Sequence, residues 1–232
     1  MTSDHVPGTA GVMSAVRALY LATAGVAADI VAHPEVRRRW DEPSVLDLMT
    51  VAALAAHLGR SLLQVEMFLD ADDPAAPRPV TAEVYYAALS GVDDLGSDLN
   101  VGVRSRAQDV AVDGPDGVAR RVRGCLDRLA GRLQDEPASR QVLAYGGHAM
   151  TVDEYLRTRL VEFCVHVEDL ALSVGLGPGV DPTDDVPDVP DDALAEALAV
   201  LVGAARRRHG DAAVLRALTR RERDAVGALR VL

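Results

Sequence analysis

The chain has 232 residues, of which 49% are hydrophobic and only 3% aromatic, and it carries a formal net charge of −11. This length allows one sizeable core with a small appendage, built mainly from aliphatic side chains. The acidic balance argues against a nucleic-acid partner, because phosphates demand a basic face. Residues 1–10 do not resemble a signal peptide, and no stretch reaches the ~20 apolar residues of a membrane span. We therefore expect a cytoplasmic protein with no membrane partner.

The first half of the chain predicts two long helices. The first extends over 11–33, where apolar residues recur at three- and four-residue steps (Val12, Val16, Leu19, Val26 and Ile30). Thr50 is a typical N-cap, and a second helix is expected over 50–69. About 45 residues then precede the next long helix, and an unstructured loop of that length would be unusual. We therefore expect short additional helices over Thr81–Leu89 and 102–112.

The second half predicts two more long helices and then a change of composition. A helix over 116–134 is marked by the apolar stripe Val118, Val122, Cys125, Leu129 and Leu133. Thr151 and Glu154 form a capping box that opens another helix over 151–175. Four prolines amid acidic residues fill Gly177–Asp192, which predicts an extended strap.

Together these elements predict an all-α fold. The bundle is formed by four long helices, over 11–33, 50–69, 116–134 and 151–175. A long crossover connection joins the second helix to the third. Two extra C-terminal helices, over about 191–209 and 211–229, are expected on its outside. We accordingly divide the chain into a bundle domain, 1–176, and a C-terminal extension, 177–232.

The helix predicted over 151–175 carries two polar faces, where an ordinary amphipathic helix needs one. The second of these is a polar row flanking the apolar face, formed by Tyr155, Arg159, Glu162, His166, Asp169 and Ser173. Glu162 and His166 lie four residues apart, so their side chains project together and can bind one ion. Such a pair is also typical of a solvated helix face. Carboxylate plus imidazole suits Zn²⁺, Fe²⁺, Mn²⁺ or Ni²⁺.

His57 borders the apolar stripe of the helix predicted over 50–69. A histidine at such a position is either a hydrogen-bonded core residue or a metal ligand. If that helix faces the polar row, His57 completes a three-ligand metal site with Glu162 and His166. Three ligands leave coordination positions open for water or substrate. In the same row, Arg159 and Asp169 are candidate catalytic residues: Arg159 can meet a carboxylate, and Asp169 can support a ligand or accept a proton. An internal ion pair that positions the ligands is the alternative.

Several other residues have roles that the sequence leaves open. Tyr85 and Tyr86 can line a pocket or fill the side of the bundle. Cys125 and Cys164 lie in predicted helices and are expected to be reduced, buried small hydrophobes. The sequence does not fix the oligomeric state, and a homodimer is one of the arrangements it allows.

Two segments resemble a known family. Residues 50–60 match the pattern T-V-x-x-L-x-x-H-L-x-R of the mycothiol-dependent maleylpyruvate isomerase family, with His57 at its histidine. Residues 159–170 resemble that family's R-x-x-E-x-x-x-H-x-x-D-L motif, with Glu162 and His166 at its glutamate and histidine. The joint occurrence of both patterns at this separation is more specific than either pattern alone.

The resemblance implies a fold, a metal and a co-substrate. It implies a DinB-like four-helix bundle in which His57, Glu162 and His166 bind zinc. It also implies mycothiol, a low-molecular-weight thiol, as the thiol co-substrate, whose thiolate a metal can favour. The family's isomerase carries an α/β domain after the bundle, whereas about 55 residues follow it here and predict helices. Isomerisation of maleylpyruvate itself is therefore not predicted.

Three functional hypotheses follow. The first is a metal-dependent enzyme that uses mycothiol for S-transfer to, or isomerisation of, a small electrophilic metabolite. The second is a thiol-independent metalloenzyme of the same fold that acts on a biosynthetic intermediate. The third is a non-catalytic metal-binding stress-response protein. An open coordination position beside a polar pocket would favour the first two.

Overall fold

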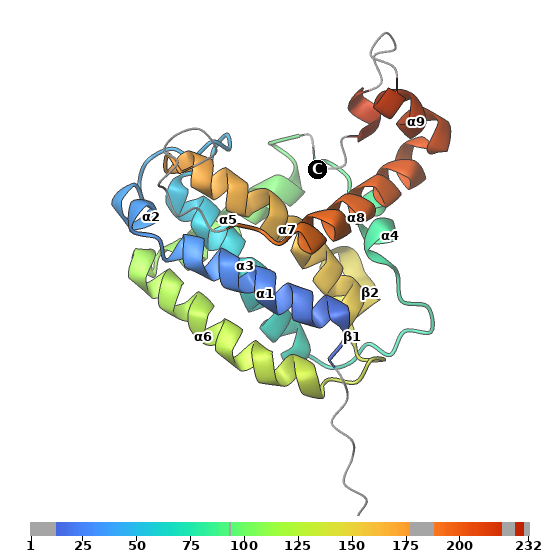
Figure 1. Cartoon of the computed structure of the whole chain (residues 1–232), viewed down its shortest axis with the longest axis horizontal. Helices are drawn as coiled ribbons and strands as arrows, with labels where there is room; N and C mark the ends of the chain where they lie inside the picture. The colour runs from blue at the N-terminus through green and yellow to red at the C-terminus, as the bar shows by residue number, and fades with distance from the viewer. Residues whose placement is uncertain (1–12, 93, 177–187, 220–225, 230–232) are drawn as a thin grey trace, which may run out of the picture.

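The computed structural model describes residues 13–92, 94–176, 188–219 and 226–229 (Figure 1). In this part of the chain the α-helices are α1 (Ala15–Val31), α2 (Pro34–Arg38), α3 (Val51–Asp70), α4 (Ala82–Ala88), α5 (Asp98–Ala111), α6 (Gly114–Asp135), α7 (Val152–Ser173), α8 (Asp191–His209) and α9 (Asp211–Thr219). The other elements are strands β1 (Gln141–Ala144) and β2 (His148–Thr151) and the 3-10 turns η1 (Tyr145–Gly147) and η2 (Val226–Leu229). The all-helical prediction is confirmed, with one small hairpin added.

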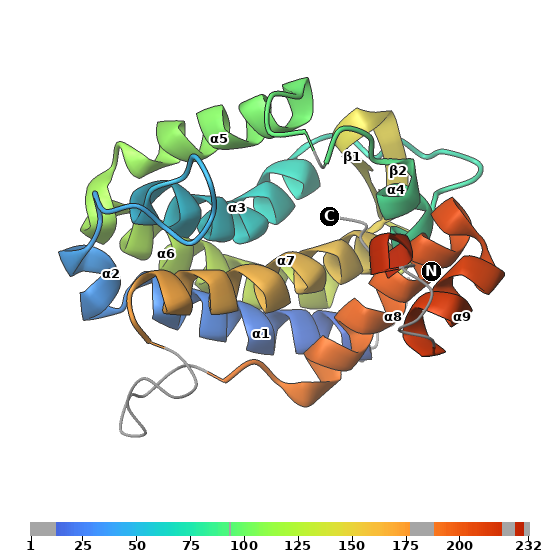
Figure 2. The same cartoon turned by 90° about the horizontal axis from the view of Figure 1, so that it is seen from above.

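Helices α1, α3, α6 and α7 pack side by side as the predicted four-helix bundle (Figures 1 and 2). Each contacts at least two of the others, and their apolar stripes meet in a core of aliphatic side chains. Tyr20 and Phe163 lie in this core with ring centroids 5.4 Å apart. Helix α5, part of the long crossover, lies along α3 outside the bundle (Figure 2).

Helix ends differ from the predictions where local caps decide them. Helix α1 begins at Ala15, because the Ser14 hydroxyl accepts a hydrogen bond from the Arg17 N–H. Helix α5 begins at Asp98, four residues earlier than expected, with Ser97 capping it in the same way. The short helix α2 was not predicted. The strap and the predicted helix over 211–229 lie partly outside the described residues: α9 ends at Thr219, and η2 is a 3-10 turn.

A β-hairpin leads the chain into α7. Strand β1 pairs antiparallel with β2, and Gly146 and Gly147 turn the chain with φ values of 74° and 78°, which favour glycine. Strands of four residues are too short to produce a readable alternation, so the sequence did not reveal them. Directly after β2, Thr151 caps the first turn of α7, as predicted.

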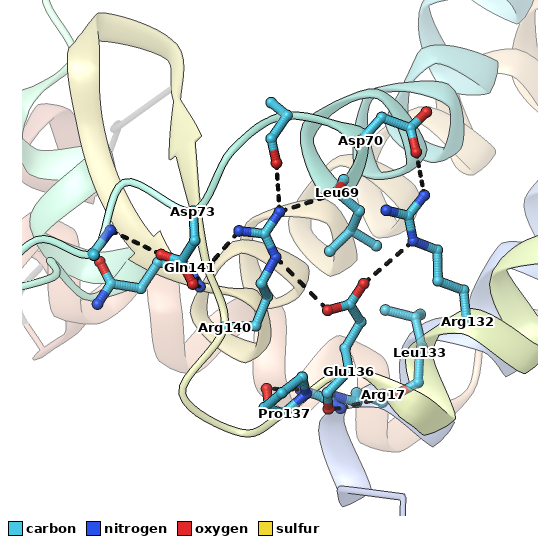
Figure 3. Close-up of polar contacts among 12 residues, drawn as sticks. Arg17, Leu69, Asp70, Asp73, Arg132, Leu133, Glu136, Pro137, Arg140 and Gln141 are labelled. Carbon is cyan, nitrogen blue, oxygen red and sulfur yellow. Dashed lines mark hydrogen bonds and ion pairs between the residues drawn. The ribbon is translucent and has the colours of Figure 1, made fainter.

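Two arginines bind the end of the bundle beside the hairpin: Arg140, directly before β1, and Arg17 on α1 (Figure 3). Arg140 donates a hydrogen bond to the carbonyl oxygen of Leu69 at 3.0 Å, and its Nε lies 3.7 Å from a carboxylate oxygen of Glu136. Arg17 is buried and donates to the carbonyl oxygens of Leu133 (2.8 Å) and Glu136 (2.6 Å). These carbonyls at helix C-termini would otherwise lack partners. The start of α7 is thereby fixed relative to α3.

Helix α8 docks on the outside of the bundle, against α7 and α4. Arg157 joins the three helices: it lies 2.7 Å from Glu83 on α4 and 2.9 Å from Glu154 on α7, and it also pairs with Glu196 on α8. None of the helices in the described part of the chain combines the length and apolarity that a membrane crossing requires.

Gly59 allows α3 to approach α6 closely, which gives a test of the bundle. A Cβ at Gly59 would lie 2.6 Å from the Val122 side chain, whereas a Cβ at Gly25 on α1 would meet nothing within 4 Å. We expect Gly59→Ala to lower the free energy of unfolding by about 1–3 kcal/mol through overpacking. The control Gly25→Ala should raise it by up to about 1 kcal/mol through helix propensity. Urea denaturation of both variants tests this, and equal stabilisation would contradict the packing described here.

Candidate metal centre

Three metal-binding side chains converge between α3 and α7. His57 lies in the second turn of α3, while Glu162 and His166 lie one turn apart on α7. The two Nε2 atoms are 3.2 Å apart, and Oε2 of Glu162 lies 3.4 Å from Nε2 of His57 and 3.6 Å from Nε2 of His166. Among the described residues, these three form the one cluster whose ligand atoms could hold a metal ion. The structure therefore brings together the three predicted ligands.

The geometry of the three donor atoms fits a metal ion. Ligands at 2.0–2.1 Å from a tetrahedral zinc ion are separated from one another by about 3.3–3.4 Å. The observed separations of 3.2, 3.4 and 3.6 Å bracket that value. Two imidazole nitrogens and a carboxylate oxygen face one another here, and a metal ion can take the place of the protons that would otherwise join them. The nitrogen and oxygen donors suit zinc and related divalent ions.

Neighbouring side chains hold the donors in orientation. Nδ1 of His166 lies 2.9 Å from Oδ2 of Asp169, so an Nδ1–H donated to this carboxylate leaves Nε2 free to bind a cation. The Tyr86 hydroxyl lies 3.2 Å from Oε1 of Glu162, which turns Oε2 toward the histidines. Arg159 is buried, with Nη2 4.0 Å from Oε1 of Glu162.

The three donors differ in their electrostatics. Burial lowers the pKa of His57, and its hydrogen bond with Glu162 only partly opposes this. Burial also disfavours protonated His166, but hydrogen bonds to Asp169 and Glu162 outweigh it and raise its pKa to about 9. Burial would raise the pKa of Glu162, yet hydrogen bonds from His166 and His57 hold it well below its usual value. Glu162 is thus ionised and His57 neutral, the forms in which each binds a cation, whereas His166 must release a proton from Nε2 when it binds one.

Asp169 contacts Nδ1 of His166, a predicted ligand, which gives it a positioning role that we can test. Asp169→Asn keeps the shape but replaces the carboxylate that orients His166. We expect metal affinity to fall about 10- to 100-fold, as with other partners of ligating histidines. Competition titrations against a chromogenic chelator measure this, with Asp169→Glu as a partial rescue. Unchanged affinity in Asp169→Asn would show that the contact is only a surface pair.

A cavity of about 520 Å³ opens beside the three donors. It lies between α3, α4, α5 and α7, and Val45, Leu46, Asp47 and Met49 also contribute to its lining. Its polar lining includes His57, Glu162, His166, Arg159, Gln64, Arg60 and Arg106, and its apolar lining includes Met49, Phe68, Leu95, Leu99 and Val103. A small molecule that fills this cavity would lie against the donor atoms.

The sequence anticipated only one side of this cavity. Arg159 lines it, as a catalytic candidate must, and Tyr85 and Tyr86 also contribute to its wall. Cys164 is buried and is not part of the lining. Arg106 was missed because α5 lies in the crossover, where no motif marked it. Arg60 is the last residue of the first family pattern, but its position in that pattern did not indicate that it lines a cavity.

Comparison with known proteins identifies the family of this fold. A sequence model described as the mycothiol maleylpyruvate isomerase N-terminal domain matches residues 21–171, which is more than half of the chain. No curated protein and no solved structure gave a match. The matched region extends from α1 to α7 and contains His57, Glu162 and His166. The resemblance seen in the two sequence patterns is confirmed.

Proposed function

The chain belongs to the mycothiol maleylpyruvate isomerase N-terminal domain family, and from this premise we propose that it is a metal-dependent enzyme using a low-molecular-weight thiol, mycothiol. The reaction is S-transfer to, or isomerisation of, a small electrophilic metabolite. One observation carries this proposal: the three donors face a cavity of about 520 Å³. Structural metal sites are closed by a fourth protein ligand, whereas catalytic sites keep a position open.

Each residue of the site has a distinct proposed role. His57, Glu162 and His166 hold the metal, for which Zn²⁺ is our first candidate and Fe²⁺, Mn²⁺ and Ni²⁺ are the others. Such an ion, when bound, lowers the pKa of a thiol and so favours its nucleophilic thiolate. Arg159 lines the cavity with a charged guanidinium at any physiological pH, and it can bind and orient a polar group of the substrate. Asp169 acts behind His166 as a positioning residue.

The nucleophilic sulfur must come from a bound thiol, because the protein's own cysteines are poorly placed. Burial raises the pKa of Cys125 to about 12, so its thiol stays protonated at neutral pH. Cys164 is buried away from the cavity lining. We expect the double variant Cys125→Ala, Cys164→Ala to retain turnover within about twofold, with only modest losses from packing. Steady-state assays test this, and a loss of activity without a loss of folding would argue for a protein nucleophile.

A conjugation assay tests the proposed function directly. Metal-loaded and chelator-treated protein are incubated with a panel of small electrophiles, with mycothiol, glutathione and no thiol in parallel. The proposal requires turnover that depends on both metal and mycothiol. Turnover that needs the metal but no thiol would support the thiol-independent metalloenzyme instead. No turnover, together with no mycothiol binding in calorimetry, would favour the non-catalytic metal-binding protein.

A further inference from the structure

The cavity concentrates positive charge in an acidic protein. Its lining includes four arginines but only two carboxylates, Asp47 and Glu162, although the chain as a whole has a net charge of −11. We propose that Arg60 and Arg106 form an anion subsite, which binds a carboxylate or phosphate group of the substrate at the part of the cavity lined by α3 and α5. This inference rests on the proposed function in one respect, namely that the cavity is the substrate site.

Arg60 and Arg106 lack a carboxylate partner, whereas several other arginines of the fold have one. Arg157 contacts three glutamates, and Arg128 lies 2.6 Å from a carboxylate oxygen of Glu66. By contrast, neither Arg60 nor Arg106 has an ion pair within 4.0 Å to any residue that the structure describes. The Nε–H of Arg106 is buried and has no hydrogen-bond acceptor among those residues. Arg39, Thr81 and Arg140 also have such an atom, but among these four residues only Arg106 lines the cavity, where a bound group could accept a hydrogen bond from its N–H.

The two guanidinium groups also affect each other. Burial lowers the pKa of Arg60, and the charge of Arg106 lowers it further, followed by smaller contributions that include Arg159. Like charges are thus held together in a partly desolvated place. A bound anion would offset both costs, because an arginine guanidinium pairs with carboxylate or phosphate through parallel hydrogen bonds.

Arg106 is held in position before any ligand binds. Its guanidinium carbon lies 4.4 Å from the centroid of the Tyr145 ring, a cation–π contact. On its own helix, Gly102 leaves room for it: a Cβ there would lie 2.8 Å from Nη1 of Arg106. A group fixed in this way loses little conformational freedom on binding.

The rest of the lining defines the class of ligand. Leu99 and Val103 on α5 and Phe68 on α3 add apolar surface to the lining of the same cavity. A molecule with an apolar body and one anionic end fits this combination, and the anion would lie on the arginines. Carboxylates and phosphates both form paired hydrogen bonds with a guanidinium group, so the experiment must distinguish between these two ligand groups.

Calorimetry with three matched probes tests the subsite. The probes are 3-phenylpropionate, its neutral amide and phenethyl phosphate, each titrated into zinc-loaded and chelator-treated protein. We expect the anions to bind roughly 10- to 100-fold more tightly than the amide, in both metal states. Arg60→Gln and Arg106→Gln should each remove most of this preference. The control Arg123→Gln removes the same charge from an exposed arginine paired with Asp29 and should leave the preference intact.

Three results would overturn the subsite: equal binding of acid and amide, a preference that survives both arginine variants, or a preference that vanishes when the metal is removed. The last would mean that the anion binds the metal alone. Gly102→Ala keeps every charge but displaces Arg106, so it should also weaken anion binding and serves if a Gln variant misfolds. Because binding is measured without metal as well, failure of the metal-dependent reaction and failure of this subsite give different results.

Discussion

Replacing Glu162 with Gln should reduce metal-dependent turnover to background. The amide keeps the size of the side chain but removes the negative charge that faces the two histidine Nε2 atoms at 3.4 and 3.6 Å. A neutral amide is a much weaker ligand for a divalent ion, and the site loses its only charged ligand. The loss of turnover should persist at metal concentrations that saturate the wild type. Elemental analysis after desalting should find less than stoichiometric metal.

Stability must be measured alongside, because Glu162 is part of a half-buried charge cluster. The carboxylate accepts a hydrogen bond from the Tyr86 hydroxyl and pairs with His166. Because the amide weakens both contacts, the metal-free variant should lose about 1–3 kcal/mol of unfolding free energy. The matched control is Glu168→Gln, which removes the same charge from an exposed position on the same helix. This control should keep both metal and turnover. Full metal occupancy in Glu162→Gln would remove Glu162 from the ligand set.

The candidate metal site was readable from the sequence because its residues lie on two regular helices. The four-residue spacing of Glu162 and His166 fixes their common direction once α7 is helical. His57 was assigned because it borders the apolar stripe of its helix and matches the histidine of the first family pattern; the stripes alone do not determine which helices face each other. The same periodicity placed Asp169 in the row of His166, and the structure shows their contact at 2.9 Å.

The far side of the cavity was not readable for the opposite reason. Arg106 comes from the crossover, whose path over the bundle depends on tertiary contacts and on caps such as Ser97. For Tyr86, also in the crossover, the sequence left open whether it lines a pocket. Periodicity identifies the apolar face of a helix, but it does not identify the helix that packs against this face when the connection between them is long. The hairpin was missed because a four-residue strand offers only two positions on each face. Sequence thus predicted the ligands, and only the structure supplied the wall opposite them.

Replacing His57 with Ala should abolish metal-induced stabilisation while changing the metal-free protein little. His57 is a partly exposed residue at the cavity wall, and the stripe around it, including Leu54 and Leu58, stays apolar and buried. We expect its removal to cost the metal-free protein no more than about 1 kcal/mol, as for a side chain outside the packed core. The wild type should gain about 2.7 kcal/mol when zinc is present at about 100 times its dissociation constant. The variant should gain almost nothing.

Thermal denaturation with and without zinc separates these two effects. The control His148→Ala removes an imidazole from the hairpin, where the ring lies 6.0 Å from that of Tyr85 and outside the metal cluster. It should keep the full zinc-dependent shift, which excludes adventitious binding to histidines in general. A zinc-dependent shift that persists in His57→Ala would mean that α7 alone binds the ion. In that case the contact between α3 and α7 would serve packing rather than the metal, and the position of the cavity beside the donors would lose its significance for function.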